Sequence, residues 1–437
     1  MTAALVSAAA ALARRQARPA IGGRVLDVSG LVVRVSGFPA ATGDIAEIET
    51  GDGRLPCEIV GFRGDDLLAV PLGPLRMVRP GAPVWRSGTR SEIAVGDGLL
   101  GRFIDPFGAP LDGDPPPSAT ARVAIDGVPL PVAERGQVDR RFATGVRVID
   151  GLLPCGRGQR IGVFAGAGCG KSVLVEQIAA HADADIVVLG LIGERGREVR
   201  ELMASPRRER MIAVVATADR SPLERVRGAA TASAIAEHFR AAGKEVLLVI
   251  DSLTRYAMAL REVGLSLGEP PATKGYPPSV FAALPRLLER VAPAAVGGAI
   301  TAFYTVLVEG DDLSDPIADA ARSLLDAHLV LARDLADRGH FPAIDPLASA
   351  SRVARRVATP AALRLADAAR STLADRRTAL ELQALGAYTP GANPTLDRAL
   401  AIGARLDAWA RQPPSQTTPW PESLARLADA LELEWTP

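Results

Sequence analysis

The sequence is poor in cysteine and in long apolar segments, and each shortage excludes a class of protein. Its three cysteines, Cys57, Cys155 and Cys169, are odd in number and show no C-x-x-C spacing, which argues against a disulfide framework and a zinc site. Although 48% of the residues are apolar, no apolar run approaches the roughly 18 residues of a membrane-spanning helix. These shortages favour a soluble protein of a reducing compartment such as the cytosol.

The chain also lacks an excess of either charge, because 50 basic residues balance 50 acidic ones. A protein whose main partner is nucleic acid needs a basic footprint, so this balance argues against such a partner. Among the basic residues only Lys171, Lys244 and Lys274 are lysines. A lysine supplies a compact ammonium where the planar fork of arginine would not fit. Lys171 lies in a glycine-rich loop, and its chemistry there is that of a phosphate ligand.

The length of 437 residues predicts two or three domains. Residues 1–20 form either a short amphipathic helix or an unstructured tail, since their arginines follow the apolar stretch and do not precede it as in a secretory signal. Residues 21–86 contain short alternating apolar runs separated by Gly, Asp and Pro, which predicts a small all-β domain, a compact barrel. The Gly-, Pro- and Asp-rich segment 98–121 is typical of a connection between domains.

Residues 87–355 contain apolar strands that alternate with helices, beginning with "RIGVF" and ending with "AITAFYTVLV". Unbroken apolar strands of this kind indicate an α/β domain with a parallel sheet covered on both faces. Ligands of such sheets bind at the carboxyl ends of the strands. Residues 356–437, rich in Ala, Leu, Arg and Asp at helical spacing, predict an α-helical third domain that includes the proline-rich stretch "QPPSQTTPWPES".

The segment "FAGAGCGKSVL" follows a predicted strand and precedes a predicted helix, as a phosphate-binding P-loop does. It meets G-x-x-x-x-G-K-[ST] except at the first position, where Ala165 replaces glycine. We expect Lys171 to bind the β and γ phosphates of ATP and Ser172 to bind Mg²⁺. The predicted nucleotide-binding residues of the loop are Ala165, Gly166, Ala167, Gly168, Cys169, Gly170, Lys171, Ser172 and Val173. A plain glycine-rich turn is the alternative.

Two carboxylates follow buried strands. Asp251 ends "VLLVID", where it would reach the Mg²⁺ shell or serve as a helix N-cap. Glu194 follows "DIVVLGLI", where it would polarise a water for attack on the γ-phosphate or be only a charge at a helix start. Both residues precede a helix, so position alone does not decide between these interpretations.

Five strings of the sequence together carry a family resemblance: "GQRIGVFAGAGCGKS", "GLIGERGREVRE", "VLLVIDSLTRYAMALREVGLSLGEPPATKGYPPSVFAALPRLLERV", "AITAFYTVLVEGDD" and "FPAIDPLASASRV". They resemble the ATPase of type III protein-export machines, the family that serves flagella and injectisomes and is related to the catalytic subunit of rotary ATP synthases. The resemblance is tight from about Gly101 to Val353. It implies a hexameric ring of RecA-like P-loop domains, with an N-terminal β-barrel and a C-terminal helical domain.

The resemblance also assigns roles. It makes Glu194 the catalytic base, Lys171 the phosphate ligand, and Asp251 and Ser172 metal residues. Arg195, Glu198 and Arg255 become supporting residues around the nucleotide, the metal and its waters. Phe341 takes the place of a tyrosine that stacks on adenine, and Arg352 that of an arginine inserted into a neighbour's site; without the resemblance, Arg352 reads as a surface charge. The loop 268–279 would face a central channel or be only a connector. The C-terminal stretch "ARQPPSQTTPWPES" departs from the usual ending of the family.

The implied function is an ATP-hydrolysing ring motor at the cytoplasmic face of the bacterial inner membrane, which releases chaperones from export substrates and unfolds them. Its implied partners are a central stalk, a stator, export-gate proteins and chaperone-bound substrates. Strings such as "LASASRV" favour the injectisome and "EPPATKGYPPS" the flagellum, and we favour the injectisome. The alternatives are a flagellar export ATPase, a rotary ATP synthase catalytic subunit, a non-catalytic ring subunit, and an RNA translocase, which the charge balance disfavours.

Overall fold

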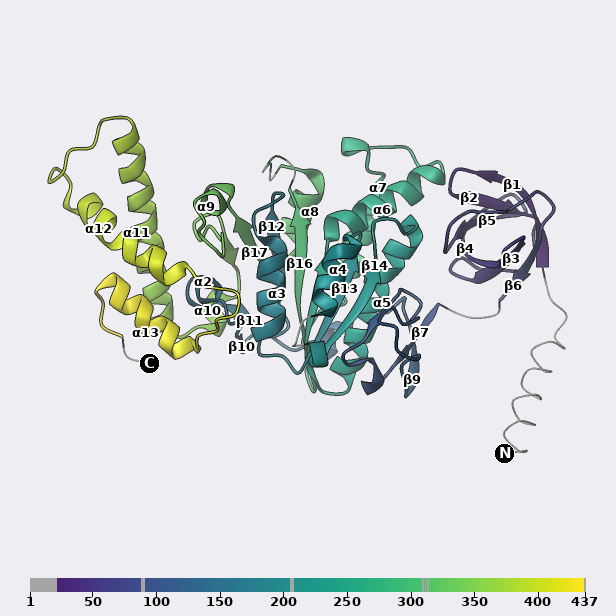
Figure 1. Cartoon of the computed structure of the whole chain (residues 1–437), viewed down its shortest axis with the longest axis horizontal. Helices are drawn as coiled ribbons and strands as arrows, with labels where there is room; N and C mark the ends of the chain where they lie inside the picture. Colours follow the sequence, from purple (N-terminus) through teal and green to yellow (C-terminus); the bar gives the residue numbers. More distant parts are fainter. Residues whose placement is uncertain are drawn as a thin grey trace. The chain divides into compact units, whose positions relative to one another are not determined.

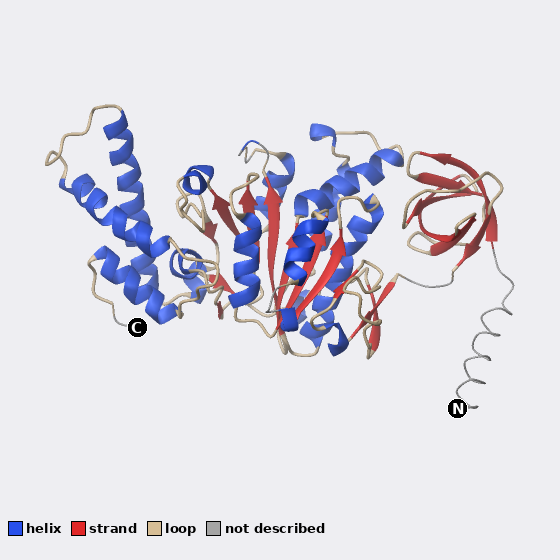
Figure 2. Ribbon diagram, in the orientation of Figure 1, coloured by secondary structure: helices blue, strands red, loops and turns tan. Residues whose placement is uncertain are grey.

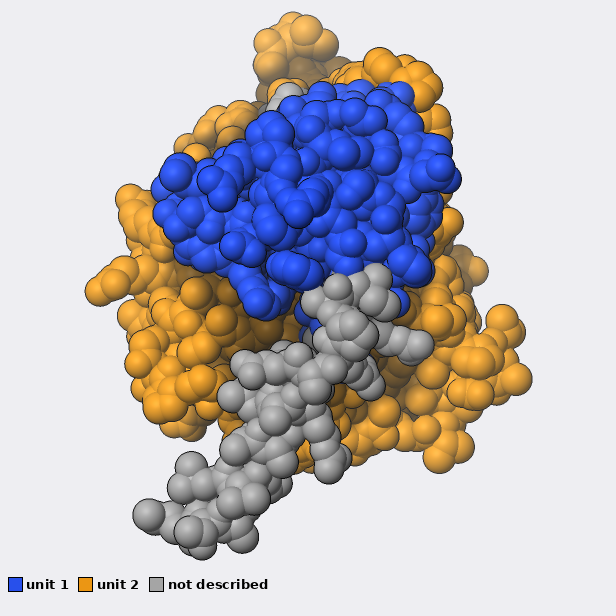
Figure 3. Space-filling view, turned by 90° about the vertical axis from the view of Figure 1, so that its right-hand side faces the viewer, with its two compact units in different colours: residues 1–92, 220–224, 262–269 blue, residues 93–219, 225–261, 270–437 orange. Residues whose placement is uncertain are grey.

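The computed structural model describes residues 22–87, 91–204, 208–308, 310, 312 and 314–435. The predicted N-terminal helix or tail, residues 1–20, lies outside them. The chain forms two compact units, which Figure 3 colours separately. The first consists of residues 1–92 with the short segments 220–224 and 262–269, and the second contains the rest. Within the described residues, no helix is long and apolar enough to cross a membrane.

The first unit contains a closed barrel of six antiparallel strands in the order β1-β2-β5-β4-β3-β6 (Figure 1). Buried residues alternate along the strands, as in Val33 and Val35 or Ile48 and Ala46, and fill the interior. The predicted small barrel is therefore confirmed. Its strands are β1 (Gly22–Ser29), β2 (Val32–Val35), β3 (Ile45–Thr50), β4 (Gly53–Arg63), β5 (Asp66–Pro71) and β6 (Pro83–Arg86).

The second unit is built on an eight-stranded sheet in the order β18-β17-β12-β16-β15-β13-β14-β8. All neighbouring pairs are parallel except β17 with the edge strand β18. The strands are β8 (Phe103–Ile104), β12 (Arg160–Ala165), β13 (Ile186–Ile192), β14 (Met211–Ala216), β15 (Glu245–Asp251), β16 (Ala299–Leu307), β17 (Ala327–Leu331) and β18 (Ala350–Ser351). The parallel sheet predicted from the apolar runs is confirmed.

One interpretation of the sequence is wrong in part. The segment 98–121 is not only a connection, because β8 within it pairs with β14 at the edge of the main sheet. The guanidinium of Arg102 also donates to both carboxylate oxygens of Asp112, at 2.7 and 3.0 Å, and so folds the segment back on itself. A two-residue strand among Gly, Pro and Asp leaves no periodic pattern, which is why its pairing is invisible in the sequence.

Helices cover both faces of the sheet (Figure 2). Along β13, Val187 and Leu189 belong to one buried cluster, whereas Val188 and Ile192 belong to another, as the two-residue period of a strand requires. The helices of this region are α3 (Lys171–His181), α4 (Gly196–Met203), α5 (Pro222–Ala241), α6 (Leu253–Ser266), α7 (Pro278–Leu288), α8 (Pro316–Leu324) and α9 (Arg333–Asp337).

The C-terminal region is helical, as predicted, and shares a buried cluster with the core of the second unit. Thr359 and Asn393 cap the two longest of its helices through their side chains. The proline-rich stretch carries the start of the last helix, at Trp420, with proline in its first turn. The helices are α10 (Ala354–Val357), α11 (Pro360–Ala384), α12 (Pro394–Ala410) and α13 (Trp420–Leu431). The last three pack against α2 (Arg147–Leu152).

The shorter elements of the described residues complete the fold. Two further two-stranded sheets are β7-β9 and the antiparallel pair β10-β11. They and the 3₁₀ turns are β7 (Glu92–Val95), β9 (Ala121–Ala124), β10 (Arg141–Phe142), β11 (Cys155–Gly156), η1 (Asp97–Leu99), η2 (Val132–Glu134), η3 (Arg208–Arg210) and η4 (Thr273–Gly275).

Candidate active site

The predicted P-loop connects the end of β12 to the start of α3. Gly168 and Gly170 have φ values of 83° and 81°, in the left-handed region that favours glycine. Gly170 is the N-cap residue and offers no side-chain cap, so the first N–H groups of α3 point out of the helix without a helical acceptor. Together with the positive end of the helix dipole, these groups form a binding site for an anion such as a phosphate.

The predicted loop residues differ in exposure. Ala165, Gly166 and Cys169 are buried. Ala165 ends β12 and does not have a positive φ, so the backbone at this position does not require glycine. Ala167, Gly168 and Val173 are exposed, and Gly170, Lys171 and Ser172 are half-buried.

Three charged residues predicted from the sequence meet at the carboxyl edge of the sheet. The ammonium Nζ of Lys171 forms an ion pair with Asp251 Oδ1 and lies 3.5 Å from Glu194 Oε1. Asp251 ends β15 and Glu194 follows β13, and these strands are neighbours in the sheet. The side chains of all three are nearly buried, with exposed fractions of 11% for Lys171, 11% for Glu194 and 6% for Asp251. A lysine placed here can neutralise both carboxylates and phosphate oxygens.

The electrostatics of Glu194 suit a general base. Burial, reinforced by the negative charge of Asp251, raises the pKa of Glu194 to about 7, although Lys171 acts in the opposite direction. A base is most effective when its pKa lies near the working pH. Nε of Arg255 lies 3.9 Å from Glu194 Oε1. A Cβ on Gly193 would come within 2.5 Å of Arg255 Cδ, so glycine at this position leaves room for the arginine.

Oxygen ligands for a magnesium ion also gather here. Ser172, Glu194, Glu198 and Asp251 contribute to the wall of a small cavity of about 40 Å³. Hydroxyl and carboxylate oxygens are the donors that Mg²⁺ prefers, and it needs only one or two carboxylates when phosphates and waters complete its shell. In the described part of the chain, no group of three or more His, Cys, Asp or Glu could hold a metal ion by itself. The hydroxyl of Ser172 and the carboxylates of Asp251 and Glu198 fit the few protein ligands of a Mg²⁺ ion that is also bound by nucleotide phosphates.

The sequence did not reveal the role of Thr305. Its hydroxyl Oγ1 donates to Asp251 Oδ1 at 2.6 Å, inside the core. This bond leaves the carboxylate oriented toward Lys171. The only signal in the sequence is a threonine near the end of the apolar strand "AITAFYTVL", beside the strand that Asp251 ends.

Phe341 lies against the P-loop. Two of its ring carbons come within 3.0 and 3.2 Å of the place that a Cβ on Gly170 would occupy. The residue is 40% exposed, so part of its ring is open to an aromatic group such as adenine. The carbonyl of Phe341 accepts the backbone N–H of Gln412 at 2.9 Å. Gln412 is buried and is a second residue that sequence reasoning missed.

Gln412 fixes the start of the proline-rich stretch to the core. Its Oε1 accepts the N–H of Arg147 at 2.8 Å, and its Nε2 donates to the carbonyl of Gly145 at 2.8 Å. Since the backbone N–H of Gln412 donates to the Phe341 carbonyl, the side-chain bonds of Gln412 indirectly help to fix the backbone of the predicted adenine-stacking residue.

The other predicted residues lie apart from this cluster. Arg195 is the N-cap residue of α4, with a side chain that is 79% exposed and 3.9 Å from Glu198. In the predicted channel loop, Lys274 has a positive φ of 47° and lies 3.9 Å from Asp312 and 3.7 Å from Asp315. Neither residue contacts the triad of Lys171, Glu194 and Asp251 through a described interaction.

Arg352 and Lys171 lie at opposite ends of the parallel strands: Arg352 lies where β17 and β12 begin, and Lys171 lies beyond the end of β12. Arg352 follows β18, which pairs with the first residues of β17, and its N–H donates to the carbonyl of Asp326. In the register of β17 with β12, Ala327 lies beside Ile161, at the start of the strand that ends in the P-loop. Four residues of strand, about 13 Å, separate that point from Ala165. Arg352 and Lys171 of one chain therefore do not belong to one site.

Comparison with known proteins identifies the family. Residues 145–351 match the nucleotide-binding domain of the ATP synthase alpha/beta family, and residues 358–429 match the T3SS EscN ATPase C-terminal domain. The flagellum-specific ATP synthase of Salmonella typhimurium is 45% identical over 421 residues, which are 93% of this chain and 92% of that protein. The chain belongs to the type III secretion and flagellar export ATPase family. The resemblance seen in the sequence is thus confirmed, and this export ATPase hydrolyses ATP.

Both branches of the family are similar to this export ATPase. The type 3 secretion system ATPase of Pseudomonas syringae pv. syringae is 44% identical over 416 residues, which are 93% of this chain and 92% of that protein. Identities of 45% and 44% do not separate a flagellar from an injectisome protein.

Solved structures agree with the fold. The assembled ATPase EscN of the enteropathogenic E. coli type III secretion system superposes with a TM-score of 0.89 at 40% identity, covering 94% of this chain and all of that one. EscN in complex with its central stalk EscO gives a TM-score of 0.86 at 39% identity, with the same coverage. The predicted α/β RecA-like core, with an N-terminal barrel and C-terminal helices, is confirmed.

Proposed function

We propose that this export ATPase works as a closed ring of identical chains, a hexamer, with each site shared between two neighbours. The observation that carries the proposal is the placement of Lys171 at the carboxyl edge of the sheet and of Arg352 at the amino edge. A head-to-tail arrangement brings the amino edge of one copy to the carboxyl edge of the next. Arg352 would then supply positive charge to the γ-phosphate that the neighbour's Lys171 holds.

The residues of the carboxyl edge have distinct tasks in the proposed reaction. The P-loop N–H groups and Lys171 bind the phosphates of ATP, and Phe341 stacks on the adenine. Glu194 orients the attacking water and accepts its proton, for which a pKa of about 7 is suitable. A bound Mg²⁺, held by Ser172 and by the carboxylates of Asp251 and Glu198, would neutralise charge on the β and γ phosphates.

Binding of ATP must change the pairing of Lys171. Its ammonium now neutralises Asp251 and Glu194, and phosphate oxygens offer it a stronger negative charge. Thr305 keeps Asp251 in place through the hydroxyl bond when the lysine turns toward the phosphates. Glu194, released from Lys171, becomes free to bind the water.

Mixing two inactive variants tests the shared site. Homogeneous assemblies of Lys171→Ala, or of Arg352→Ala, should not hydrolyse ATP, because every site lacks one partner. In mixed assemblies, an intact Lys171 meets an intact Arg352 wherever the two kinds of chain are neighbours in the right order, so activity should return. The matched control is Arg355→Ala, an exposed arginine nearby that should stay active alone. Absence of recovery in assemblies shown to be mixed contradicts the proposal.

We further propose that the motor serves an injectisome at the cytoplasmic face of the inner membrane, where it releases chaperones from export substrates and unfolds them. Its partners would be a central stalk, a stator and export-gate proteins. The assembled EscN and its stalk complex support the ring and the stalk.

Deleting the gene tests whether the protein serves an injectisome or a flagellum, and the measurements are effector secretion and swimming motility. Loss of secretion alone supports the injectisome, and loss of motility identifies the flagellar alternative. The C-terminal match to EscN favours either over a rotary ATP synthase subunit.

A further inference from the structure

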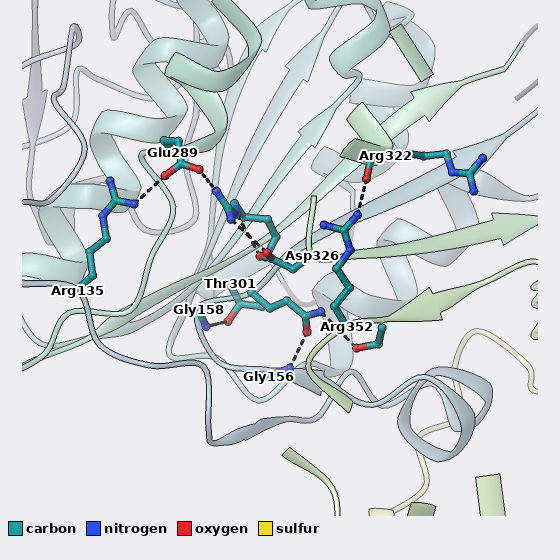
Figure 4. Close-up of polar contacts among 11 residues, drawn as sticks. Arg135, Gly156, Gly158, Glu289, Thr301, Arg322, Asp326 and Arg352 are labelled. Carbon is teal, nitrogen blue, oxygen red and sulfur yellow. Dashed lines mark hydrogen bonds and ion pairs between the residues drawn. The ribbon is translucent and has the colours of Figure 1, made fainter. Parts of the chain in front are cut away.

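Arg352 is held from two sides by the connection between α8 and β17. Its backbone N–H donates to the carbonyl of Asp326 at 3.0 Å. Its Nη2 donates to the carbonyl of Arg322 at 3.2 Å (Figure 4). Arg322 lies in the last turn of α8, where carbonyl groups lack helical partners and attract positive charge. The position of the Arg352 guanidinium therefore depends on where the segment 322–326 lies.

That segment is fastened to β12 through Asp326. The carboxylate of Asp326 accepts the backbone N–H, the Nε and the Nη2 of Arg160, each at 3.1 Å. The backbone N–H of Asp326 in turn donates to the carbonyl of Arg160 at 2.9 Å. Four hydrogen bonds between two residues fix both their separation and their orientation, and the paired guanidinium contacts are of the strong, charge-assisted kind.

Arg160 is itself held from its other side. Glu289 bridges the guanidinium groups of Arg160 and Arg135, with a distance of 2.7 Å to Arg135 (Figure 4). With a carboxylate on each side, the guanidinium of Arg160 has no freedom to follow a moving Asp326. The start of β12 is thus a fixed support for the segment 322–326.

We infer that Asp326 is a positioning residue that aims Arg352 at the site of the neighbouring chain. The inference rests on the proposed function, since it assumes that Arg352 acts on a neighbour. In an assembly, a charge that must meet a γ-phosphate across an interface cannot rely on the flexible arginine stem alone. Asp326 ties the backbone of Arg352 to β12, the strand whose other end forms the chain's own P-loop.

The test places Asp326→Asn in one or the other partner of the mixed assembly. In the first mixture, Lys171→Ala chains that also carry Asp326→Asn must supply the working Arg352 to Arg352→Ala chains. In the second, the Asp326→Asn change is in the Arg352→Ala chains, which supply only Lys171. We expect the first mixture to recover roughly tenfold less activity than the parent mixture, and the second to match it within about twofold.

The difference between the two mixtures distinguishes a role of Asp326 in positioning Arg352 from a role in folding. Equal losses in both mixtures would mean that Asp326 only supports the fold, and no loss in either would mean that Arg352 does not depend on it; both results overturn the inference. Asp319→Asn, an exposed carboxylate of α8, is the matched control and should cost nothing in either chain. If Asp326→Asn chains do not fold, Arg160→Lys, which keeps the charge but not the fork, should show the same asymmetry. If the parent mixture of Lys171→Ala and Arg352→Ala chains has no activity, the result instead contradicts the proposed function, in which two chains share one site.

Discussion

Glu194→Gln should make this ATPase more stable while it abolishes turnover. The pKa of Glu194 is raised from an ordinary 4.5 to about 7, mainly because burial disfavours the charged carboxylate. A raised pKa in the folded state means that the ionised group destabilises the fold at pH values above its unfolded pKa, and that this cost is absent well below it. Glutamine keeps the size and the hydrogen-bonding groups and removes the charge.

The magnitude follows from the shift. A difference of roughly 2.5 pKa units corresponds to about 3 kcal/mol, because each unit is worth about 1.4 kcal/mol. The cost of the ionised carboxylate grows from about 1 kcal/mol at pH 5 to about 3 kcal/mol above pH 8, where both states have lost the proton. The stability gained by Glu194→Gln should therefore rise with pH in the same way.

Urea unfolding of nucleotide-free protein at pH 5 and pH 8.5 measures this gain. Tryptophan fluorescence is a suitable probe, because Trp409, Trp420 and Trp435 belong to the same compact unit as Glu194. Glu201→Gln is the control, since its side chain is 62% exposed and should show no such pH dependence. Turnover of Glu194→Gln should fall by orders of magnitude with ATP binding retained. A gain that does not increase with pH would refute the electrostatic reasoning, and turnover within about twofold of the parent would refute the role as base.

Three further changes test the rest of the site. Phe341→Ala should weaken ATP binding about tenfold or more in calorimetric titrations, whereas Phe341→Tyr should be nearly neutral, since base stacking is worth roughly 1–3 kcal/mol; normal binding by the alanine variant would show that the ring is only packing. Thr305→Val removes the donor to Asp251 and should lower kcat about tenfold, most at limiting Mg²⁺; unchanged magnesium dependence would contradict this. Gln412→Ala should raise the KM for ATP several-fold with kcat nearly unchanged, because the backbone N–H that holds the Phe341 carbonyl loses the side-chain bonds to Arg147 and Gly145 that fix its position; an effect on kcat alone would exclude this role of Gln412.

The sequence predicts well what local pattern determines. Unbroken apolar runs become the parallel strands, and residues that follow such strands meet at one edge of the sheet, which is why Lys171, Glu194 and Asp251 are brought together as expected. The turn at Gly170 needs a left-handed residue, and this requirement is visible in the glycine-rich loop itself.

What the sequence does not predict depends on packing between distant segments. The hydrogen bond between Gln412 and the carbonyl of Phe341 joins a glutamine before two prolines to a loop that no local pattern connects with it. The short strand β8 pairs through two residues in a stretch that looks like a linker. The support of Arg352 by backbone carbonyls of Arg322 and Asp326 carries no side-chain signature of its own. Such contacts follow from the fold and not from residue type.

The separation of Lys171 and Arg352 on opposite edges of one sheet has an arithmetic consequence. Under the proposed sharing, a free chain owns two half-sites and no whole one, and an open row of chains always has one whole site fewer than it has members. Only closure of the row gives every chain a partner on both sides. The rate of ATP hydrolysis per chain should thus rise as the rows lengthen and should rise once more when the ring closes. An assay of ATP hydrolysis would therefore also report on assembly.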